Sequence, residues 1–241
     1  MKRGTLYGIG VGPGDPGLMT MKALQCIRSC DVIILPAAPK EDCHAYRIAR
    51  AACREIEEKE IVCLPFFMTK NREERLASHQ EIYDRVAGFL EQGKKTGFLT
   101  IGDPSVYSTY GYLHEKELQN GKTPVMISGV PSFCAAACAA GIALVKGEEQ
   151  LHIIPAGTAP EDTLYLKGTR VYMKSGRHLK QLKELLLETE KTGNILVYSI
   201  SNCGMEQERI AAGADKIDEQ SGYLTVVIVK EKTDGTFVPF F

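Results

Sequence analysis

The chain has 241 residues, of which 44% are apolar and 24% charged, a balance that is typical of folded globular proteins and excludes a disordered chain. It carries 29 lysines and arginines against 30 aspartates and glutamates, so it lacks the basic excess needed to bind nucleic-acid backbones. Glycines interrupt the N-terminal apolar stretch at once, which argues against a signal peptide or membrane span, and we expect a cytoplasmic protein without a membrane partner.

The first half of the chain alternates short apolar or β-branched runs with longer segments of helical periodicity. This alternation predicts a mostly parallel α/β sheet, because each connection is long enough for a right-handed crossover. The expected strands are Thr5–Val11, Asp31–Leu35, Glu60–Leu64, Gly97–Ile101 and Pro124–Ser128. The expected helices are Thr20–Ser29, His44–Ile56, Arg72–Gln92 and Ser132–Ala140.

A polar stretch near Leu144–Gln150 interrupts this series, and a second series of strands and a helix follows. The helix has leucines at helical spacing. We therefore predict an α/β fold with two α/β lobes, residues 1–145 and 146–241, and a ligand-binding cleft between them. In the second lobe the expected elements are strands Leu151–Pro155, Arg170–Lys174, Ile195–Ser201 and Tyr223–Lys230, and helix His178–Glu190.

A glycine-rich run, Gly8–Gly17, follows the first expected strand, and its Gly12, Gly14 and Gly17 formally have the GxGxxG spacing of a dinucleotide site. Pro13 and Pro16 argue against such a site, because proline has no N–H group to offer a pyrophosphate. The second strand also ends without an acidic residue for a ribose. The loop alone is equally compatible with a rigid ligand-binding wall and with a tight connection that binds nothing.

Two further strand ends carry loops of the same kind. Gly102-Asp103-Pro104 follows the fourth strand, and a carboxylate there could bind ligand N–H or hydroxyl groups or cap the next helix. Ser132 follows the fifth strand, and an N-cap is its structural explanation. Three Gly/Pro loops at the ends of parallel strands favour one shared site, since open α/β folds bind ligands at that edge.

The eight cysteines are scattered and lack the CxxC pairs of zinc or iron–sulfur sites. Cys26/Cys30 and Cys134/Cys138 are i,i+4 pairs that could hold half a metal site. Cysteine on an alanine-rich helix more often fills core, so we expect no metal centre. Reduced thiols are consistent with a reducing compartment.

These loops together, in this order, resemble the tetrapyrrole methylase family, the class III S-adenosylmethionine methyltransferases. The resemblance spans essentially the whole chain through G-V-G-P-G-D-P-G-L-M-T, G-D-P-S-V-Y-S-T, G-V-P-S-F, V-Y-M-K and Q-E-R. The run Thr100–Thr109 is similar to the subgroup that methylates carbon 20 of precorrin-2 or cobalt-factor II in cobalamin biosynthesis. The resemblance implies the tetrapyrrole methylase fold, a tetrapyrrole substrate and a homodimer.

It also implies S-adenosylmethionine as cofactor, folded between the lobes, and S-adenosylhomocysteine as product. Asn202 and Thr225 depart from the small Gly and Ala common at their positions in the family. The implied cofactor contacts are Pro13, Gly102, Asp103, Pro104, Val106, Ser132, Phe133, Met173, Asn202 and Thr225.

Methyl transfer from a sulfonium needs the nucleophilic carbon, the methyl carbon and the sulfur nearly in line, so positioning should supply most of the catalysis. The meso carbon of the substrate is electron-rich and can attack without a strong base. We expect Asp103 to orient the cofactor or assist the proton, and Tyr107 to face the macrocycle, as the two candidate catalytic residues. Candidate cations for the substrate carboxylates are Lys40, Arg47, Lys174 and Arg177.

Three alternatives stay open. One is another regiospecific tetrapyrrole methylase, acting on carbons 2 and 7 of uroporphyrinogen III or on carbon 17. The others are a dinucleotide-binding oxidoreductase and a non-catalytic sensor or assembly module. We favour a single methylation at carbon 20, with cobalt-factor II slightly preferred because a thiol-rich chain suits an anaerobic host that inserts cobalt early.

Overall fold

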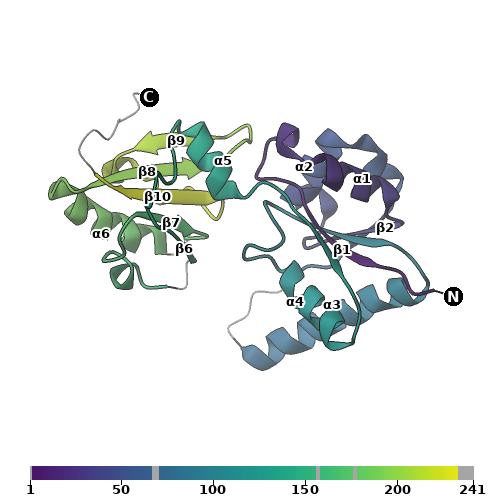
Figure 1. Ribbon diagram of the computed structural model, residues 1–241. Coiled ribbons are helices and arrows are strands. Elements are labelled where there is room, and N and C mark those ends of the chain that lie inside the picture. Colours follow the sequence, from purple (N-terminus) through teal and green to yellow (C-terminus); the bar gives the residue numbers. More distant parts are fainter. Residues whose placement is uncertain (1, 67–70, 156–157, 176–177, 233–241) are drawn as a thin grey trace. The chain divides into compact units, whose positions relative to one another are not determined.

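A computed structural model describes residues 2–66, 71–155, 158–175 and 178–232 (Figure 1). The chain forms two compact units, Met1–Pro131 and Ser132–Phe241. Both are α/β, which confirms the predicted fold class. The boundary between the units precedes the alanine-rich helix, whereas the sequence pattern places it near residue 145.

The first unit is built on a parallel five-stranded sheet in the order β3-β2-β4-β1-β5. All four residues of β2 are buried, as expected for a parallel sheet covered on both faces. In this order β1 lies between β4 and β5, so the loops that leave these three strands share one edge of the sheet. The strands are β1 (Leu6–Gly10), β2 (Val32–Leu35), β3 (Glu60–Cys63), β4 (Thr96–Thr100) and β5 (Val125–Ile127).

Four α-helices cover this sheet, with α1 and α2 on one face and α3 and α4 on the other (Figure 1). Tyr110 of α4 packs over β1, where a Cβ on Gly8 would lie 2.3 Å from its ring. Helix α4 is missing from the predicted elements, although Tyr110, Leu113 and Glu117 are buried at helical spacing. The helices are α1 (Met21–Ser29), α2 (His44–Ala52), α3 (Arg72–Glu91) and α4 (Tyr110–Gln119).

The predicted helix over His44–Ile56 is shorter in the structure. Helix α2 ends at Ala52, and a separate 3-10 helix, η3 (Arg54–Glu58), follows. Cys53, between them, has an extended backbone (φ −146°), which interrupts the α-helical hydrogen bonds. Two more 3-10 helices, η1 (Pro16–Leu18) and η2 (Lys40–Asp42), lie in the loops after β1 and β2.

The second unit has a mixed five-stranded sheet in the order β6-β7-β10-β8-β9. Strand β6 is parallel to β7, whereas β10 runs antiparallel to both β7 and β8. The C-terminal ends of β7 and β8 therefore flank the start of β10. The strands are β6 (Leu151–Pro155), β7 (Thr169–Met173), β8 (Ile195–Ser201), β9 (Arg209–Ala212) and β10 (Thr225–Glu231).

Helices α5 (Ser132–Ala139) and α6 (Leu179–Lys191) lie on opposite sides of this sheet (Figure 1). The leucines of α6 pack on β8 and β10 in one buried cluster. Helix α5 contacts β10, which explains why it belongs to the second unit although the sequence pattern groups it with the first. Strand β9 is also absent from the predicted elements, because it is a short, half-exposed edge strand with a weak apolar pattern.

Candidate functional site

Four glycines form a backbone junction where β1, β4 and β5 end. Gly12 and Gly102 exchange two backbone hydrogen bonds, N–H to O=C, of 3.3 and 2.8 Å. A Cβ on Gly129 would lie 2.1 Å from the carbonyl oxygen of Gly102, and a Cβ on Gly10 would lie 2.6 Å from that same atom. The three Gly/Pro loops are thus brought together as predicted, with no room for a side chain at their crossing.

The loop after β1 does not present a helix N-terminus to a ligand. Its carboxylate Asp15 accepts a 2.7 Å hydrogen bond from the backbone of Gly17 and caps the 3-10 helix η1. Helix α1 begins only at Met21, with Thr20 as its N-cap. Pro13 is buried within this loop. This geometry argues against a dinucleotide site. A Rossmann loop leads directly into its helix, and a Rossmann sheet has the strand order 3-2-1-4-5, whereas this sheet has the order β3-β2-β4-β1-β5.

Asp103 ties the second loop to the third. Its Oδ1 accepts hydrogen bonds from the backbone N–H and the hydroxyl of Ser105, at 2.8 and 2.5 Å, and its Oδ2 accepts one from the backbone of Gly129 at 3.0 Å. Burial favours the protonated acid, but these hydrogen bonds prevail and lower the pKa of Asp103 below its usual value. Asp103 does not cap α4, whose N-cap position is Thr109.

The rest of this loop presents Tyr107 on a left-handed backbone. Its φ of +46° is unfavourable for a bulky residue, and 43% of the residue is exposed. Ser108 follows, and its hydroxyl donates to Thr100 Oγ1 at 2.9 Å and accepts from the backbone N–H of Tyr110 at 3.1 Å. Pro104 is buried and Val106 half-buried. Ser108 therefore holds the loop between the end of β4 and the start of α4.

The candidate residues of the second unit lie at one edge of its sheet. Met173 ends β7 and pairs with Val226, while Thr225 pairs with Ser201 at the end of β8. Asn202 follows Ser201 with a φ of +52°, and its backbone N–H donates to Leu224 O at 3.0 Å. Met173, Thr225 and Asn202 are thus brought together by the antiparallel return of β10.

Ser132 and Phe133 are the first residues of α5, with Ser132 half-buried and Phe133 buried. They belong to the second unit, whereas the G-V-P part of their motif belongs to the first.

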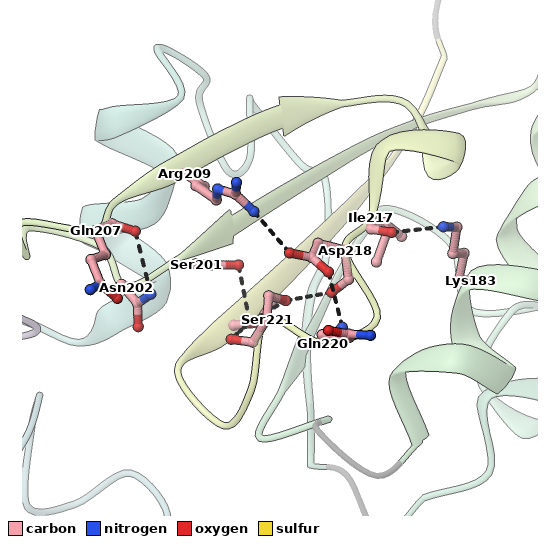
Figure 2. A network of polar contacts seen from close by, with 10 residues as sticks. Lys183, Ser201, Asn202, Gln207, Arg209, Ile217, Asp218, Gln220 and Ser221 are labelled. Atoms are coloured by element: carbon pink, nitrogen blue, oxygen red, sulfur yellow. Dashed lines mark hydrogen bonds and ion pairs between the residues drawn. The ribbon is translucent and has the colours of Figure 1, made fainter.

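A hydroxyl cluster that the sequence did not indicate supports this edge. Thr225 Oγ1 lies 3.1 Å from Ser201 Oγ and 2.9 Å from Ser221 Oγ, and it also donates to the backbone carbonyl of Ser221 at 3.1 Å. Figure 2 shows how this network continues to Asp218, which forms an ion pair of 2.9 Å with Arg209. Thr225 is 2% exposed, and its hydroxyl is hydrogen-bonded within the protein.

The candidate cations occupy different places. Lys40 and Arg47 are exposed beyond the end of β2, with Lys40 Nζ 5.8 Å from the ring centroid of Tyr46. Lys174 directly follows Met173 at the edge of the second sheet, and its Nζ lies 5.4 Å from the ring centroid of Tyr223. Arg177 lies outside the described residues.

The cysteines behave differently in the two pairs. Cys26 on α1 and Cys30, the C-cap residue that follows this helix, are buried core residues, as predicted, whereas on α5 Cys134 is half-buried and Cys138 is exposed. Within the described ranges, no three His, Cys, Asp or Glu side chains gather into a metal site. In the same part of the chain, no helix has both the length and the apolar character needed to cross a membrane.

Comparison with known proteins gives a consistent result. The model of the Tetrapyrrole (Corrin/Porphyrin) Methylases matches residues 5–216. A probable cobalt-precorrin-2 C(20)-methyltransferase from Methanocaldococcus jannaschii is 32% identical over 93% of this chain and 95% of its own. A precorrin-2 C(20)-methyltransferase from Sinorhizobium sp. is 30% identical over 94% of this chain and 95% of its own.

Among solved structures, a uroporphyrin-III C-methyltransferase from Thermus thermophilus, complexed with S-adenosylhomocysteine, has the same fold. Its TM-score is 0.66 at 19% identity, with 94% of this chain and 97% of that one covered. With the matching family model and relatives at 30% identity or above over nearly the whole chain, the protein belongs to the tetrapyrrole methylase family.

Proposed function

We propose that the protein is an S-adenosylmethionine-dependent C-methyltransferase that methylates carbon 20 of cobalt-factor II or precorrin-2 in cobalamin biosynthesis. The observation that carries this proposal is the near full-length match to relatives named for methylation of that carbon. One of these is named for the cobalt-containing substrate and the other for the metal-free one. The preference for cobalt-factor II therefore stays a proposal, supported by the higher identity of the cobalt-named relative.

The residues at the two sheet edges fit S-adenosylmethionine by their chemistry. Met173 and Val106 offer apolar surface for an adenine, while the amide of Asn202 and the hydroxyl of Ser132 can hydrogen-bond a ribose or an amino-acid group. When bound, the cofactor supplies a methyl group activated by a sulfonium. As the family resemblance implies, we propose that residues of both units bind the cofactor.

The protein's own part in the reaction is to position groups. We propose that Asp103 is a positioning residue, because its carboxylate is ionised at neutral pH and engaged by Ser105 and Gly129. It fixes the turn at Gly102–Pro104 against the third loop. Tyr107, presented on a strained and exposed backbone, is the proposed contact with the macrocycle. Such placement matters because small misalignments are costly in a direct displacement.

We further propose that the protein is a cytoplasmic homodimer. The family resemblance supports the dimer, and the absence of a membrane-spanning helix among the described residues is compatible with the location.

The proposal is tested by incubating the protein with S-adenosylmethionine carrying a carbon-13 methyl group and either cobalt-factor II or metal-free precorrin-2. Mass spectrometry should show one added methyl group, and carbon-13 NMR of the product from metal-free precorrin-2 should place it at the meso bridge between rings A and D. A methyl group at any other carbon would refute the assignment of carbon 20. Faster turnover of the metal-free substrate would reverse the proposed metal preference and leave the regiochemistry intact.

A further inference from the structure

The inward face of helix α3 continues beyond the hydrophobic core of the first unit. Tyr83 is buried in that core, and His79 and Leu76 precede it on the same side of the helix, at helical spacing. Exposure rises along this stripe, because His79 is half-buried and Leu76 is 56% exposed. The first two turns of α3 therefore expose part of an apolar face that the rest of the helix buries.

Aromatic rings from three separate segments meet at this face. The ring centroid of His79 lies 4.2 Å from that of Tyr112, in the first turn of α4, and 5.4 Å from that of Phe66, which follows β3. Phe66 packs edge-on against the buried Phe98 of β4 at 5.9 Å. Because β3 is parallel to its neighbours, Phe66 lies at the sheet edge from which the Gly/Pro loops emerge. The cluster is thus anchored in the core at one end, while Tyr112 is 50% exposed at the other.

The exposed end of the cluster adjoins the loop that carries Tyr107. The backbone N–H of Tyr112 donates to Thr109 O at 3.3 Å, so Tyr112 lies in the turn that directly continues this loop. Tyr110, in the same turn, is fully buried, and its hydroxyl donates to Val125 O at 3.1 Å. The start of α4 is therefore fixed on the sheet, and it presents Tyr107 and Tyr112 from one short segment.

The charged residues on this face of α3 are positive. Arg75 and Arg72 stand four and seven residues before His79, and both spacings belong to one side of a helix. The acidic residues of the first turn, Glu73 and Glu74, lie about 100° and 200° around the helix from Arg72. Burial, and after it the positive charge of Arg75, lower the pKa of His79 below its ordinary value of 6.5. The face thus combines rings that are neutral at pH 7 with positive charges at the start of the helix.

We infer that the surface formed by Phe66, Leu76, His79 and Tyr112, the aromatic patch, binds one face of the tetrapyrrole macrocycle. This inference rests on the proposed function, which supplies a large, flat, apolar ring system with carboxylates at its rim. Aromatic and aliphatic side chains pack against such a ring system, and arginines pair with carboxylates. Tyr107 alone offers too little surface to bury four pyrrole-derived rings, and the aromatic patch extends its contact towards β3.

The first experiment compares Leu76→Ala with Leu118→Ala as its matched control. The two leucines are 56% and 52% exposed, and Leu118 lies near the C-terminal end of α4, outside the aromatic patch. Figure 1 shows α3 and α4 on the same face of the sheet. Dissociation constants for cobalt-factor II are measured by absorbance titration with S-adenosylhomocysteine at saturation. Leu76→Ala should weaken macrocycle binding by about fivefold, because apolar surface that the ligand covers is lost, and the control should be unchanged.

Tyr112 provides a second comparison on the other helix. Tyr112→Ala removes the exposed ring and should weaken macrocycle binding by about tenfold or more, as is found for flat bases stacked on aromatic side chains. Tyr112→Phe keeps the ring and should stay within about threefold of the wild type. Calorimetry with S-adenosylhomocysteine should give the wild-type dissociation constant for every variant, because the patch contacts the substrate and not the cofactor.

Equal macrocycle affinities in the wild type, Leu76→Ala and Tyr112→Ala would overturn the inference, and so would a wild-type protein that does not bind cobalt-factor II. An equal loss of S-adenosylhomocysteine binding would overturn it as well, since the patch would then only support the fold. Light scattering that gave a smaller mass for the variants, with unchanged macrocycle affinity, would assign the patch to contacts between chains instead. The proposed function fails separately: a wild type that binds the macrocycle through the patch but transfers no methyl group would refute the function and support the inference.

Discussion

Replacing Gly129 with alanine should break the glycine junction of the first unit. The new Cβ would lie 2.1 Å from the carbonyl oxygen of Gly102 and 2.8 Å from the carbonyl carbon of Gly10. Both neighbours are backbone, so no side-chain rotation can relieve the clash, and the loops must separate until the first contact exceeds about 3.0 Å.

The cost has two parts. Overpacking typically destabilises by about 1–3 kcal/mol. Separation of the loops also stretches the hydrogen bond from Gly129 N–H to the Asp103 carboxylate, and bonds to charged groups contribute about 1.5–3 kcal/mol. We therefore expect Gly129→Ala to lower the free energy of unfolding by about 2.5–6 kcal/mol, a large share of an ordinary domain's stability.

Urea unfolding followed by circular dichroism measures this loss, and calorimetry with S-adenosylhomocysteine measures the effect on the proposed cofactor site. The matched control is Gly88→Ala in the interior of α3, where a Cβ would meet nothing within 4 Å. This control should stabilise the protein by about 0.5–1 kcal/mol, because alanine is the better helix former. A Gly129→Ala protein with the urea midpoint and binding constant of the wild type would refute the close-packed junction.

Three further predictions concern the same site and the assembly. Asp103→Asn should destabilise the protein by about 1–3 kcal/mol at pH 7. The NH2 group of the new amide would face one of the two backbone N–H donors that now bond to the carboxylate, and that hydrogen bond would be lost. Because the pKa of Asp103 is lowered on folding, its contribution is present above the ordinary value of 3.8 and disappears as pH falls through the folded value. Urea midpoints of the two proteins should therefore converge in acid, and a gap that does not depend on pH would contradict this. Tyr107→Gly should relieve a strain of about 1 kcal/mol and melt no lower than the wild type, yet lose methyl transfer; unchanged turnover would remove Tyr107 from the site. Light scattering at micromolar concentration should give twice the chain mass of 26.5 kDa, and the mass of a single chain would disprove the homodimer.

The sequence by itself determined the features that depend on local patterns. The alternation of apolar runs and helical periodicity predicted both α/β units, and the fully apolar β2 is buried as its composition requires. The sequence pattern predicted the three Gly/Pro loops at the ends of β1, β4 and β5. Pro13 and Pro16 argued against a dinucleotide site. These inferences succeed because propensity, periodicity and turn chemistry are properties of neighbouring residues.

Only the tertiary structure decided which of these residues meet. The order β3-β2-β4-β1-β5 brings the glycines of three loops together, and Asp103 finds its partner Gly129 26 residues away. Strand β10 returns between β7 and β8 and places Thr225 beside Ser201. The Thr225 hydroxyl therefore hydrogen-bonds Ser201 and helps to hold the loop before β10, a contact that no sequence motif predicted. Strand order and cross-strand register arise from packing between distant segments, and no local pattern of one sequence encodes which distant segment will be the partner.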